Sequence, residues 1–446
     1  MKVLIETHGC KLNLADSQHM AREFMDAGFT VAATAETPDV YVLNTCTVTH
    51  VADHKARQAL ASARRLHPHA LVVAAGCYVE RAEDAAAALP SVDLAVPNRS
   101  KDELVSRVAK RLGPAFTPFT RDTGAAGLRT SSIVRRGPLL WRTRAAVKIQ
   151  EGCDQVCAYC IVPKVRGRER SIPEQELVAQ VRQLSEAGCP EVVLTGTQLG
   201  SYGSDLGPAS LSLAELVRRV LVYTPVPRLR ISSLQPLEVT DELLGLWSGV
   251  GKGRLCPHFH LPLQSGSDKV LREMRRRYDS ASFAATVGRV RSAVPGCSIT
   301  TDLIAGFPGE TEADHSATLS LMNNVRFADA HVFPYSRRPG TSAFYLGGQV
   351  AASVRAERAA ELRTLASQHG AEHRRRFIGT VRPVVWERGS RLNGLTDNYL
   401  RVRMGGKSHR ETSELSPGLA EDVLLTAIDG DVIVGAPAFV GQTAAG

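Results

Sequence analysis

Several features common in membrane and secreted proteins are missing from this 446-residue chain. No run of 18 or more apolar residues occurs, so the sequence predicts no membrane-spanning helix. The first eight residues place Glu6 and His8 close behind a short apolar stretch and lack the longer apolar segment of a secretory signal. We also find no low-complexity segment and no solenoid period. The sequence therefore predicts a cytoplasmic protein without a membrane partner, of about two to four globular domains.

Acidic residues are fewer than basic ones: 45 Asp and Glu stand against 54 Lys and Arg, a formal net charge of +9. Such an excess can simply keep the protein soluble, or it can attract a polyanionic partner such as RNA. Composition alone does not separate these two interpretations.

Cysteine, by contrast, is abundant, with nine residues in the chain. Disulfides are rare in the cytoplasm, and an odd number of cysteines cannot all be paired. Metal binding or catalysis is therefore the better interpretation. Cys189, Cys256 and Cys297 belong to no pattern, and we assign them no role beyond core or surface thiols.

Residues 1–113 alternate short apolar runs with helix-like segments. Apolar runs rich in β-branched residues are typical of buried parallel strands, and their alternation with helices predicts a three-layer α/β domain. The expected strands are 2–6, 40–44 and 71–75. Residues 114–138 contain Pro, Gly, Thr and Arg without periodicity, and we interpret them as a linker.

Residues 139–369 repeat the alternation six times, which predicts a partial (β/α)6 barrel. The expected strands are 145–150, 191–195, 228–232, 258–261, 298–304 and 330–333, and the helical segments include 173–187 and 268–277. Residues 371–441 carry short strands, at 381–387 and 399–404, among frequent glycines. This last pattern predicts a small all-β barrel.

Cys153, Cys157 and Cys160 form a C-x3-C-x2-C pattern directly after the first strand of the expected barrel. Three thiolates on one short loop are suited to bind three irons of a [4Fe–4S] cluster. No fourth cysteine follows at ferredoxin spacing, so the fourth iron would stay open to another ligand. A zinc site is the alternative, but its fourth ligand would have to come from a distant residue such as His258 or His260.

Cys10, Cys46 and Cys77 are far apart in the sequence, yet each follows one of the three strands expected in residues 1–113. Because the carboxyl ends of parallel strands share one edge of a sheet, these cysteines should converge there. They lie in polar turns, which favours a second [4Fe–4S] cluster over the alternative of three buried core cysteines.

The loop of Cys153, Cys157 and Cys160, with Tyr159 before its last cysteine, resembles the signature of the radical S-adenosylmethionine (SAM) superfamily. The resemblance implies that SAM binds the open iron and is cleaved to methionine and a 5′-deoxyadenosyl radical. Polar residues and glycines follow other barrel strands, where barrel active sites lie. The SAM-binding candidates are Tyr159, Thr195, Gly196, Ser232, Ser233, Gly306 and Glu310, with Arg166 and Arg168 added because they lie near the cysteine loop.

An α/β region with three cysteines, a radical SAM barrel and a small β-barrel, in this order, resemble the methylthiotransferase family over nearly the whole chain. The matching motifs are GCKLN at 9–13, DS at 16–17, NTC at 44–46, GC at 76–77, the segment 151–160, VP at 162–163 with RG at 166–167, and LPLQSGS at 261–267. One departure is Lys164, because the family usually has an aromatic residue after the proline at this point.

The resemblance implies a reaction in which a radical removes hydrogen from an unactivated carbon. Sulfur associated with an auxiliary cluster on Cys10, Cys46 and Cys77 is then inserted, and a second SAM supplies the methyl group. An electron donor such as flavodoxin or ferredoxin is also implied, with a sulfur source that the sequence does not identify. Residues 371–441 resemble the RNA-binding TRAM module, which makes the anticodon loop of tRNA the expected partner. The RNA-contact candidates are Arg374, Arg375, Arg376, Arg401 and Arg403.

Three substrates occur in this family: isopentenyladenosine in tRNA, threonylcarbamoyladenosine in tRNA, and an aspartate of a ribosomal protein. Segments 147–153, 194–203, 258–261 and 394–402 most resemble the threonylcarbamoyladenosine type, which implies modification of C2 at position 37 of tRNA. The other two substrates stay open as alternatives, as does a non-catalytic RNA-binding iron–sulfur sensor. The serines and glycines at strand ends favour an enzyme, because a structural cluster needs no SAM pocket.

Overall fold

The computed structural model describes residues 1–32, 36–113, 143–207, 210–387, 393–405 and 420–438. The linker predicted at 114–138 lies outside these ranges. Among the helices in the described ranges, none is both long enough and apolar enough to cross a membrane.

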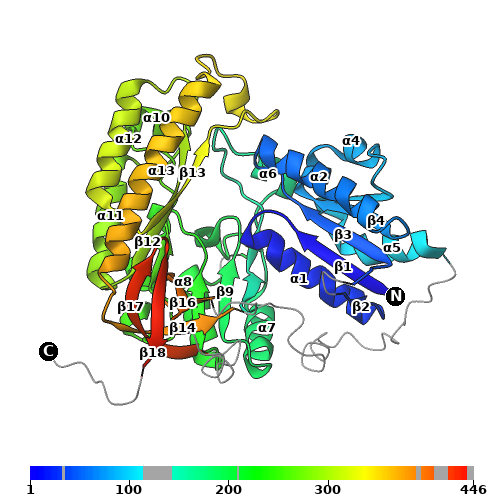
Figure 1. Ribbon diagram of the computed structural model, residues 1–446, viewed down its shortest axis with the longest axis horizontal. Coiled ribbons are helices and arrows are strands. Elements are labelled where there is room, and N and C mark those ends of the chain that lie inside the picture. The colour runs from blue at the N-terminus through cyan, green and yellow to red at the C-terminus, as the bar shows by residue number, and fades with distance from the viewer. Residues whose placement is uncertain (33–35, 114–142, 208–209, 388–392, 406–419, 439–446) are drawn as a thin grey trace.

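A parallel sheet of five strands, in the order β2-β1-β3-β4-β5, forms the N-terminal part of the molecule (Figure 1). The three central strands match the predicted ones, whereas β2 and β5 are short edge strands that the sequence did not predict. The strands are β1 (Lys2–Thr7), β2 (Thr30–Val31), β3 (Val40–Thr45), β4 (Leu71–Gly76) and β5 (Leu94–Pro97).

Helices cover both faces of this sheet. Helices α1 (Lys11–Asp26) and α5 (Leu104–Leu112) pack on one face, where their apolar side chains join one core. Helix α2 (His50–Leu66) packs on the other face, together with the short helices α3 (Cys77–Arg81) and α4 (Glu83–Ala87). The central strands are apolar along their length because both of their faces are buried. The predicted three-layer α/β arrangement is confirmed.

Six parallel strands form the partial barrel that the sequence predicted. Strands β6, β9 and β10 pair side by side, as do β11, β12 and β13, and a bridge between Leu229 and Leu255 links the two groups. No pairing between β6 and β13 occurs in the described residues, so the barrel is open on that side. The strands are β6 (Ala145–Lys148), β9 (Glu191–Thr195), β10 (Arg228–Ile231), β11 (His258–His260), β12 (Ser298–Ala305) and β13 (Asp329–Pro334).

An outer layer of helices covers the barrel strands. Alternate strand residues such as Val192, Leu194 and Leu229 pack under these helices, so the residues between them face the barrel interior. Helix α8 begins at a Ser212 cap, whose side chain accepts a hydrogen bond from the backbone of Glu215. The main helices are α7 (Glu174–Glu186), α8 (Leu213–Tyr223), α9 (Asp241–Ser248), α11 (Ser280–Ala293), α12 (Glu312–Val325) and α13 (Ala352–Arg375).

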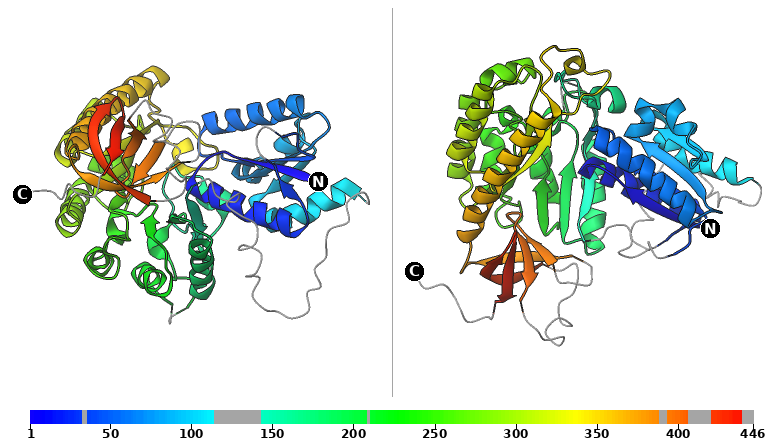
Figure 2. Two further views of the ribbon diagram at one scale, coloured as in Figure 1. Left: turned by 60° about the horizontal axis from the view of Figure 1, so that its bottom comes forward. Right: turned by 45° about the horizontal axis from the view of Figure 1, so that its top comes forward.

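The N-terminal sheet and its helices lie against the open side of the barrel, as Figures 1 and 2 show. At one edge, Gln18 of α1 accepts a hydrogen bond from the backbone of Ala146 in β6, over 3.1 Å. At the other edge, Arg338 in the loop after β13 forms a buried ion pair with Asp53 of α2, at 2.9 Å. The N-terminal part thus bridges both edges of the opening.

A closed barrel of five strands ends the chain, in the order β14-β15-β16-β18-β17, as predicted. It docks at the amino ends of the larger barrel's strands (Figure 2). There Arg228 and Arg230 of β10 donate hydrogen bonds to backbone carbonyls of Pro383 (3.3 Å) and Asp397 (2.9 Å). The strands are β14 (Val381–Trp386), β15 (Asn393–Thr396), β16 (Arg401–Met404), β17 (Ala420–Asp429) and β18 (Val432–Pro437).

Two boundaries differ from the prediction. The helix expected at 268–277 ends early: α10 spans Asp268–Glu273, and Arg275 adopts a left-handed φ of 60° that ends any helix. The expected division between residues 369 and 371 falls inside α13, which continues to Arg375 and connects the two barrels. Both errors arose where a polar run carried no signal for where the helix ends.

Candidate active site

The carboxyl edge of the N-terminal sheet brings Cys10, Cys46 and Cys77 together. Cys10 caps α1, Cys46 follows β3, and Cys77 begins α3 directly after β4. The loop at Gly9 needs glycine, because φ is 112° and an added Cβ would lie 2.7 Å from the Cβ of Cys46. This close approach places the first two cysteines side by side, and the charges of Cys10 and Cys77 both act on Cys46.

We call the three thiols of this edge the auxiliary triad; Cys46 and Cys77 are buried, and Cys10 is exposed. Burial raises the pKa of Cys46 to about 11 and also raises that of Cys77. Asn98 Nδ2 donates a hydrogen bond to the Sγ of Cys77 over 3.3 Å. All nine cysteines are free of disulfides. Buried thiols with a raised pKa ionise readily only when a cation binds them, which fits iron ligation.

The loop of Cys153, Cys157 and Cys160, which we call the radical-loop triad, follows the short strand β7 (Gln150–Glu151). Its path is fixed by backbone contacts: Cys153 N donates to Gly167 O over 3.1 Å, and a Cβ at Gly152 would lie 1.9 Å from Arg168 O. Burial raises the pKa of Cys153 to about 11 and that of Cys160 to about 12.

Arg276 is a residue of this site that the sequence did not reveal. Its Nη1 donates to the Sγ of Cys157 over 3.3 Å and lies 3.5 Å from the hydroxyl of Tyr159, while its Nη2 donates to Gln235 over 3.2 Å. The only sequence signal was the basic run at 275–277, which we placed on a helix. A guanidinium aimed at a thiol sulfur stabilises negative charge there.

The predicted SAM-binding residues at strand ends divide into two groups. Thr195 and Ser232 are buried at the barrel mouth, where the Ser232 hydroxyl donates to that of Thr195 over 3.4 Å. Beside Gly196, the side chain of Gln150 accepts hydrogen bonds from the backbone of Thr197 and Gln198. Tyr159 packs in a small core near the radical-loop triad, and Ser233 is half-buried at the mouth.

Gly306 and Glu310 form the second group, and they interact with each other within one turn. Glu310 accepts a hydrogen bond from Gly306 N (2.9 Å) and pairs with Arg358 (3.0 Å), while Arg355 fills the space beside Gly306, whose φ is 73°. These contacts connect the turn after β12 to α13.

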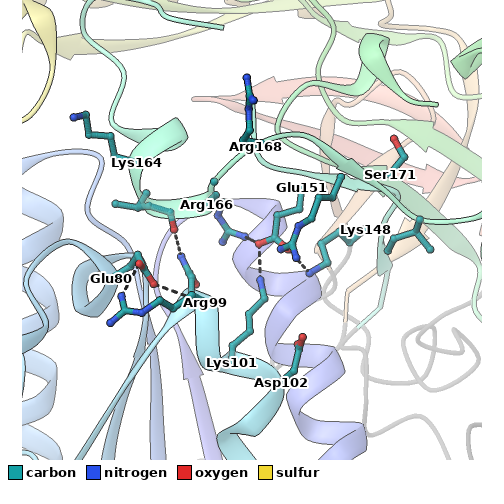
Figure 3. A pocket seen from close by; sticks show the side chains of 15 residues that line it. Glu80, Arg99, Lys101, Asp102, Lys148, Glu151, Lys164, Arg166, Arg168 and Ser171 are labelled. Carbon is teal, nitrogen blue, oxygen red and sulfur yellow. Dashed lines mark hydrogen bonds and ion pairs between the residues drawn. The ribbon is translucent and has the colours of Figure 1, made fainter. Parts of the chain in front are cut away.

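A network of five charges, four of them buried and Lys148 half-buried, links the N-terminal part to the barrel. Figure 3 shows Lys101, Lys148, Glu151 and Arg166 of this network. Asp16 of α1 pairs with Lys148 (2.7 Å), Lys101 (3.2 Å) and Arg166 (2.9 Å), and Glu151 pairs with Lys148 (3.0 Å) and Arg166 (2.6 Å). These cations hold the pKa of both carboxyls below their usual range, that of Glu151 at about 2.

The network changes the interpretation of Arg166. Its place near the cysteine loop made it a candidate for SAM binding, but its guanidinium is engaged by Asp16, Glu151 and Asn13, and Cys77 is a main cause of its raised pKa. It therefore lies beside the auxiliary triad. Arg168 remains highly exposed, with a long contact of 3.4 Å to Asp154.

A pocket of about 560 Å³ lies next to this network. Its rim carries the exposed cations Lys164, Arg168 and Arg170 (Figure 3). The opposite wall carries Glu80 and Arg99, which form an ion pair at 2.7 Å. Lys164, the departure from the family pattern, thus points into a basic rim rather than packing as an aromatic residue would.

The predicted RNA contacts fall into two groups, arginines in ion pairs and exposed arginines. Arg374 pairs with Asp431 at 2.8 Å, and Arg403 of β16 pairs with Asp429. Arg375, Arg376 and Arg401 are exposed; the first two lie at the end of α13, and Arg401 lies on β16.

Comparison with known proteins assigns the family. Residues 2–97 match the uncharacterized protein family UPF0004, and residues 147–322 match the radical SAM superfamily. The chain is 35% identical over 413 residues to threonylcarbamoyladenosine tRNA methylthiotransferase MtaB of Bacillus subtilis, covering 91% of this chain and 90% of that protein. The chain belongs to the radical SAM methylthiotransferase family. A relative with the same printed name, from Aquifex aeolicus, is 35% identical over 93% of this chain and 99% of its own.

Other relatives carry a different printed substrate. A tRNA-2-methylthio-N(6)-dimethylallyladenosine synthase of Methylacidiphilum infernorum is 32% identical, over 88% of this chain and 85% of that protein. Among solved structures, the radical SAM methyltransferase TsrM of Kitasatospora setae matches with a TM-score of 0.55 at 16% identity, over 77% of this chain and 76% of that one. This last likeness concerns the fold.

Membership in the methylthiotransferase family confirms the predicted cofactors, SAM and [4Fe–4S] clusters. The donor sets fit them: each triad offers three free thiols, and an N–H group of Asn98 or Arg276 is directed at one sulfur of each. Hydrogen bonds to sulfur are a common means of tuning such clusters. Cys189, Cys256 and Cys297 are buried core thiols.

Proposed function

We propose that this enzyme methylthiolates C2 of N6-threonylcarbamoyladenosine at position 37 of tRNA. The three relatives with that printed substrate are 35 to 36% identical, and those named for dimethylallyladenosine are 32 to 33% identical. Because this difference in identity is small, we base the choice of substrate on the polarity of the barrel interior.

The side chains that line the interior beside α1 are polar. Those with nitrogen groups are Lys11 of α1, Arg230 of β10, His258 and His260 of β11, and His331 of β13. The carboxylates among them, Glu191 and Asp302, already pair with Arg230 and with the histidines His260 and His331. A dimethylallyl group is apolar and would leave buried polar groups without partners, at an energetic cost. The threonylcarbamoyl group carries a carboxylate, a hydroxyl and amides, and suits such a lining.

We assign the metal sites in the same proposal. The radical-loop triad of Cys153, Cys157 and Cys160 would hold the cluster that binds SAM, and the auxiliary triad of Cys10, Cys46 and Cys77 would hold the second. When bound, these groups supply the radical, the inserted sulfur and, from a second SAM, the methyl group. Flavodoxin or ferredoxin would deliver electrons, and the reaction would take place in the cytoplasm.

The protein's own residues have separate tasks in this proposal. Arg276 stabilises the thiolate of Cys157 and positions Tyr159, and Thr195, Ser232 and Ser233 offer hydroxyls at the barrel mouth for a ribose. Arg375, Arg376 and Arg401 would contact RNA phosphates, whereas Arg374 and Arg403 are already paired. The basic rim of Lys164, Arg168 and Arg170 offers a second anionic contact.

The test is nucleoside mass spectrometry of tRNA from a bacterial strain that lacks its own threonylcarbamoyladenosine methylthiotransferase and expresses this chain. Methylthio-threonylcarbamoyladenosine should appear with the natural chain and be absent with C157A. A strain lacking the dimethylallyladenosine enzyme, treated in parallel, should stay unmodified. The opposite pattern would assign the chain to dimethylallyladenosine. No methylthio nucleoside in either strain, with methylthio-aspartate in ribosomal protein, would assign it to the third substrate.

A further inference from the structure

Lys11, one residue after Cys10, extends from the N-terminal part of the molecule toward the barrel interior. Its Nζ lies 5.4 Å from the ring centroid of Tyr399, a residue of the terminal barrel. The same ring stacks on His258 with centroids 4.1 Å apart, and the guanidinium of Arg230 lies 5.1 Å from it. Elements from all three parts of the chain therefore meet at Lys11.

The ammonium group of Lys11 lacks a matching carboxylate. Within the described ranges, no Asp or Glu forms an ion pair with it. Glu191, a carboxylate whose charge acts on Lys11, is already bound by Arg230 at 2.7 Å and Arg228 at 2.6 Å. A largely buried cation without a partner is costly, which indicates an anionic ligand.

A second group of polar side chains lies on the neighbouring strands. Asp302 of β12 contacts His260 on one side, at 3.3 Å, and His331 on the other, at 3.2 Å. The Thr300 hydroxyl lies 3.0 Å from the rings of both His258 and His260, and so fixes their orientation. The hydrogen bond to Asp302 raises the pKa of His331, whose side chain is 58% exposed and within reach of the charge of Lys11.

We propose that Lys11 and His331 form the subsite that binds the carboxylate of the substrate's amino-acid group, with Asp302 as a positioning residue for His331. This inference rests on the proposed function, because only threonylcarbamoyladenosine among the two tRNA substrates carries such a carboxylate. The Lys11 ammonium is the direct ligand. Its desolvated position makes a charge-assisted hydrogen bond stronger than one at the surface.

His260, Asp302 and His331 also place three potential ligand atoms within 4.8 Å of one another, as a divalent cation site would. Their surroundings favour an anion instead. The charge of Lys11 acts on His331, those of Lys11 and Arg230 act on the neighbouring His258, and the group itself offers a single carboxylate. Added positive charge at this point would be repelled by the ammonium of Lys11.

The experiment compares the binding of three anticodon stem-loop RNAs to the full chain with both clusters reconstituted. They differ only at position 37: threonylcarbamoyladenosine, its threonyl methyl ester, and isopentenyladenosine. The natural chain should bind the carboxylate form about tenfold or more tightly than the ester, the effect of one charge-assisted hydrogen bond. K11M should bind both forms equally, and K11R should keep most of the preference. The control K55M removes an exposed lysine of α2 and should behave as the natural chain.

The outcomes separate this inference from the function on which it rests. A preference for the carboxylate form that survives in K11M, with iron content unchanged, overturns the subsite and leaves the proposed function intact. Tightest binding of isopentenyladenosine RNA by the natural chain overturns the proposed function. If K11M loses iron, H331N decides the question: an unchanged carboxylate preference in H331N also overturns the subsite. One equivalent of zinc that the natural chain holds beside its iron and H331N lacks would identify a cation site, and overturn it too.

Discussion

Nη1 of Arg276 lies 3.3 Å from Sγ of Cys157, although 119 residues separate them in the chain. A positive donor at a cluster sulfur favours the more negative, reduced state of the cluster. We expect R276M to lower the reduction potential of the radical-loop cluster by about 60 mV, the equivalent of a charged hydrogen bond of about 1.5 kcal/mol for one electron. A redox titration followed by electron paramagnetic resonance measures this.

The matched control is R277M, which removes the exposed neighbouring arginine of the same run. It should leave the potential where it is in the natural chain. Equal potentials in all three proteins would show that the contact between Arg276 and Cys157 does not tune the cluster.

Iron content tests the two triads. The natural chain should bind about eight irons, and a C10A/C46A/C77A variant about four, because each triad would hold one four-iron cluster. C189A removes a buried thiol from the barrel core and should keep the natural content. An iron content that the triple substitution leaves unchanged would remove the auxiliary cluster from the proposal.

The buried charge network predicts a strong dependence of stability on Glu151. E151Q leaves Lys101, Lys148 and Arg166 with Asp16 as their shared carboxylate, so each of these three cations loses one partner. Breaking such a network costs about 3–5 kcal/mol in the free energy of unfolding. Urea denaturation at neutral pH measures the loss, and E242Q, at an exposed position of α9, is the control.

The same network sets a pH window. The pKa of Glu151 falls from its ordinary 4.5 to about 2 in the folded state, because Lys148 and Lys101 favour its ionised form. Its contribution to stability is therefore fully present above pH 4.5 and is lost as pH falls from 4.5 toward 2. Across this range, the free energy of unfolding should change more steeply with pH in the natural chain than in E151Q. Identical pH profiles would mean that Glu151 is not paired as described.

RNA affinity should depend on the candidate arginines that form no ion pair with another described residue. Replacing Arg375, Arg376 and Arg401 by alanine should weaken tRNA binding, because fewer phosphates are then neutralised. The slope of log affinity against log salt should fall by about 0.7 to 0.9 for each phosphate that no longer meets an arginine. The control variant R374A/R403A removes two arginines that already pair with Asp431 and Asp429, and should change the slope less. A larger effect in the control would show that the RNA lies on another face.

Local pattern was enough to predict most of the strands. Strands such as β3 and β9 are continuous apolar runs because both of their faces are buried, and this leaves a clear signal. Strand β2 has two residues and β5 four, too short for any periodicity to be detected. Arg275 ends α10 because its backbone is left-handed, and an arginine in the sequence does not predict this conformation.

The site residues can also be divided into those with a local sequence signal and those without one. The two triads could be predicted because Cys10, Cys46 and Cys77 each follow a strand of one sheet, and the other three cysteines share one short loop. Asn98, Arg276 and Lys11 act on partners in distant segments or other parts of the molecule, and only the tertiary fold brings those together. Proximity in sequence was misleading for Arg166, whose partners Asp16 and Asn13 are 150 and 153 residues away.

Tyr399 occupies a left-handed conformation, with φ at 72°, at the point where the terminal barrel touches His258. A bulky residue rarely adopts this conformation unless its surroundings hold it there. The terminal barrel thus covers polar residues of the larger barrel's interior, in addition to the RNA contacts that we propose for it. Its removal would uncover Arg230 and the histidines to water, so a truncated chain would lose this cover and those RNA contacts together. Exchange of this barrel between relatives would carry this cover with it.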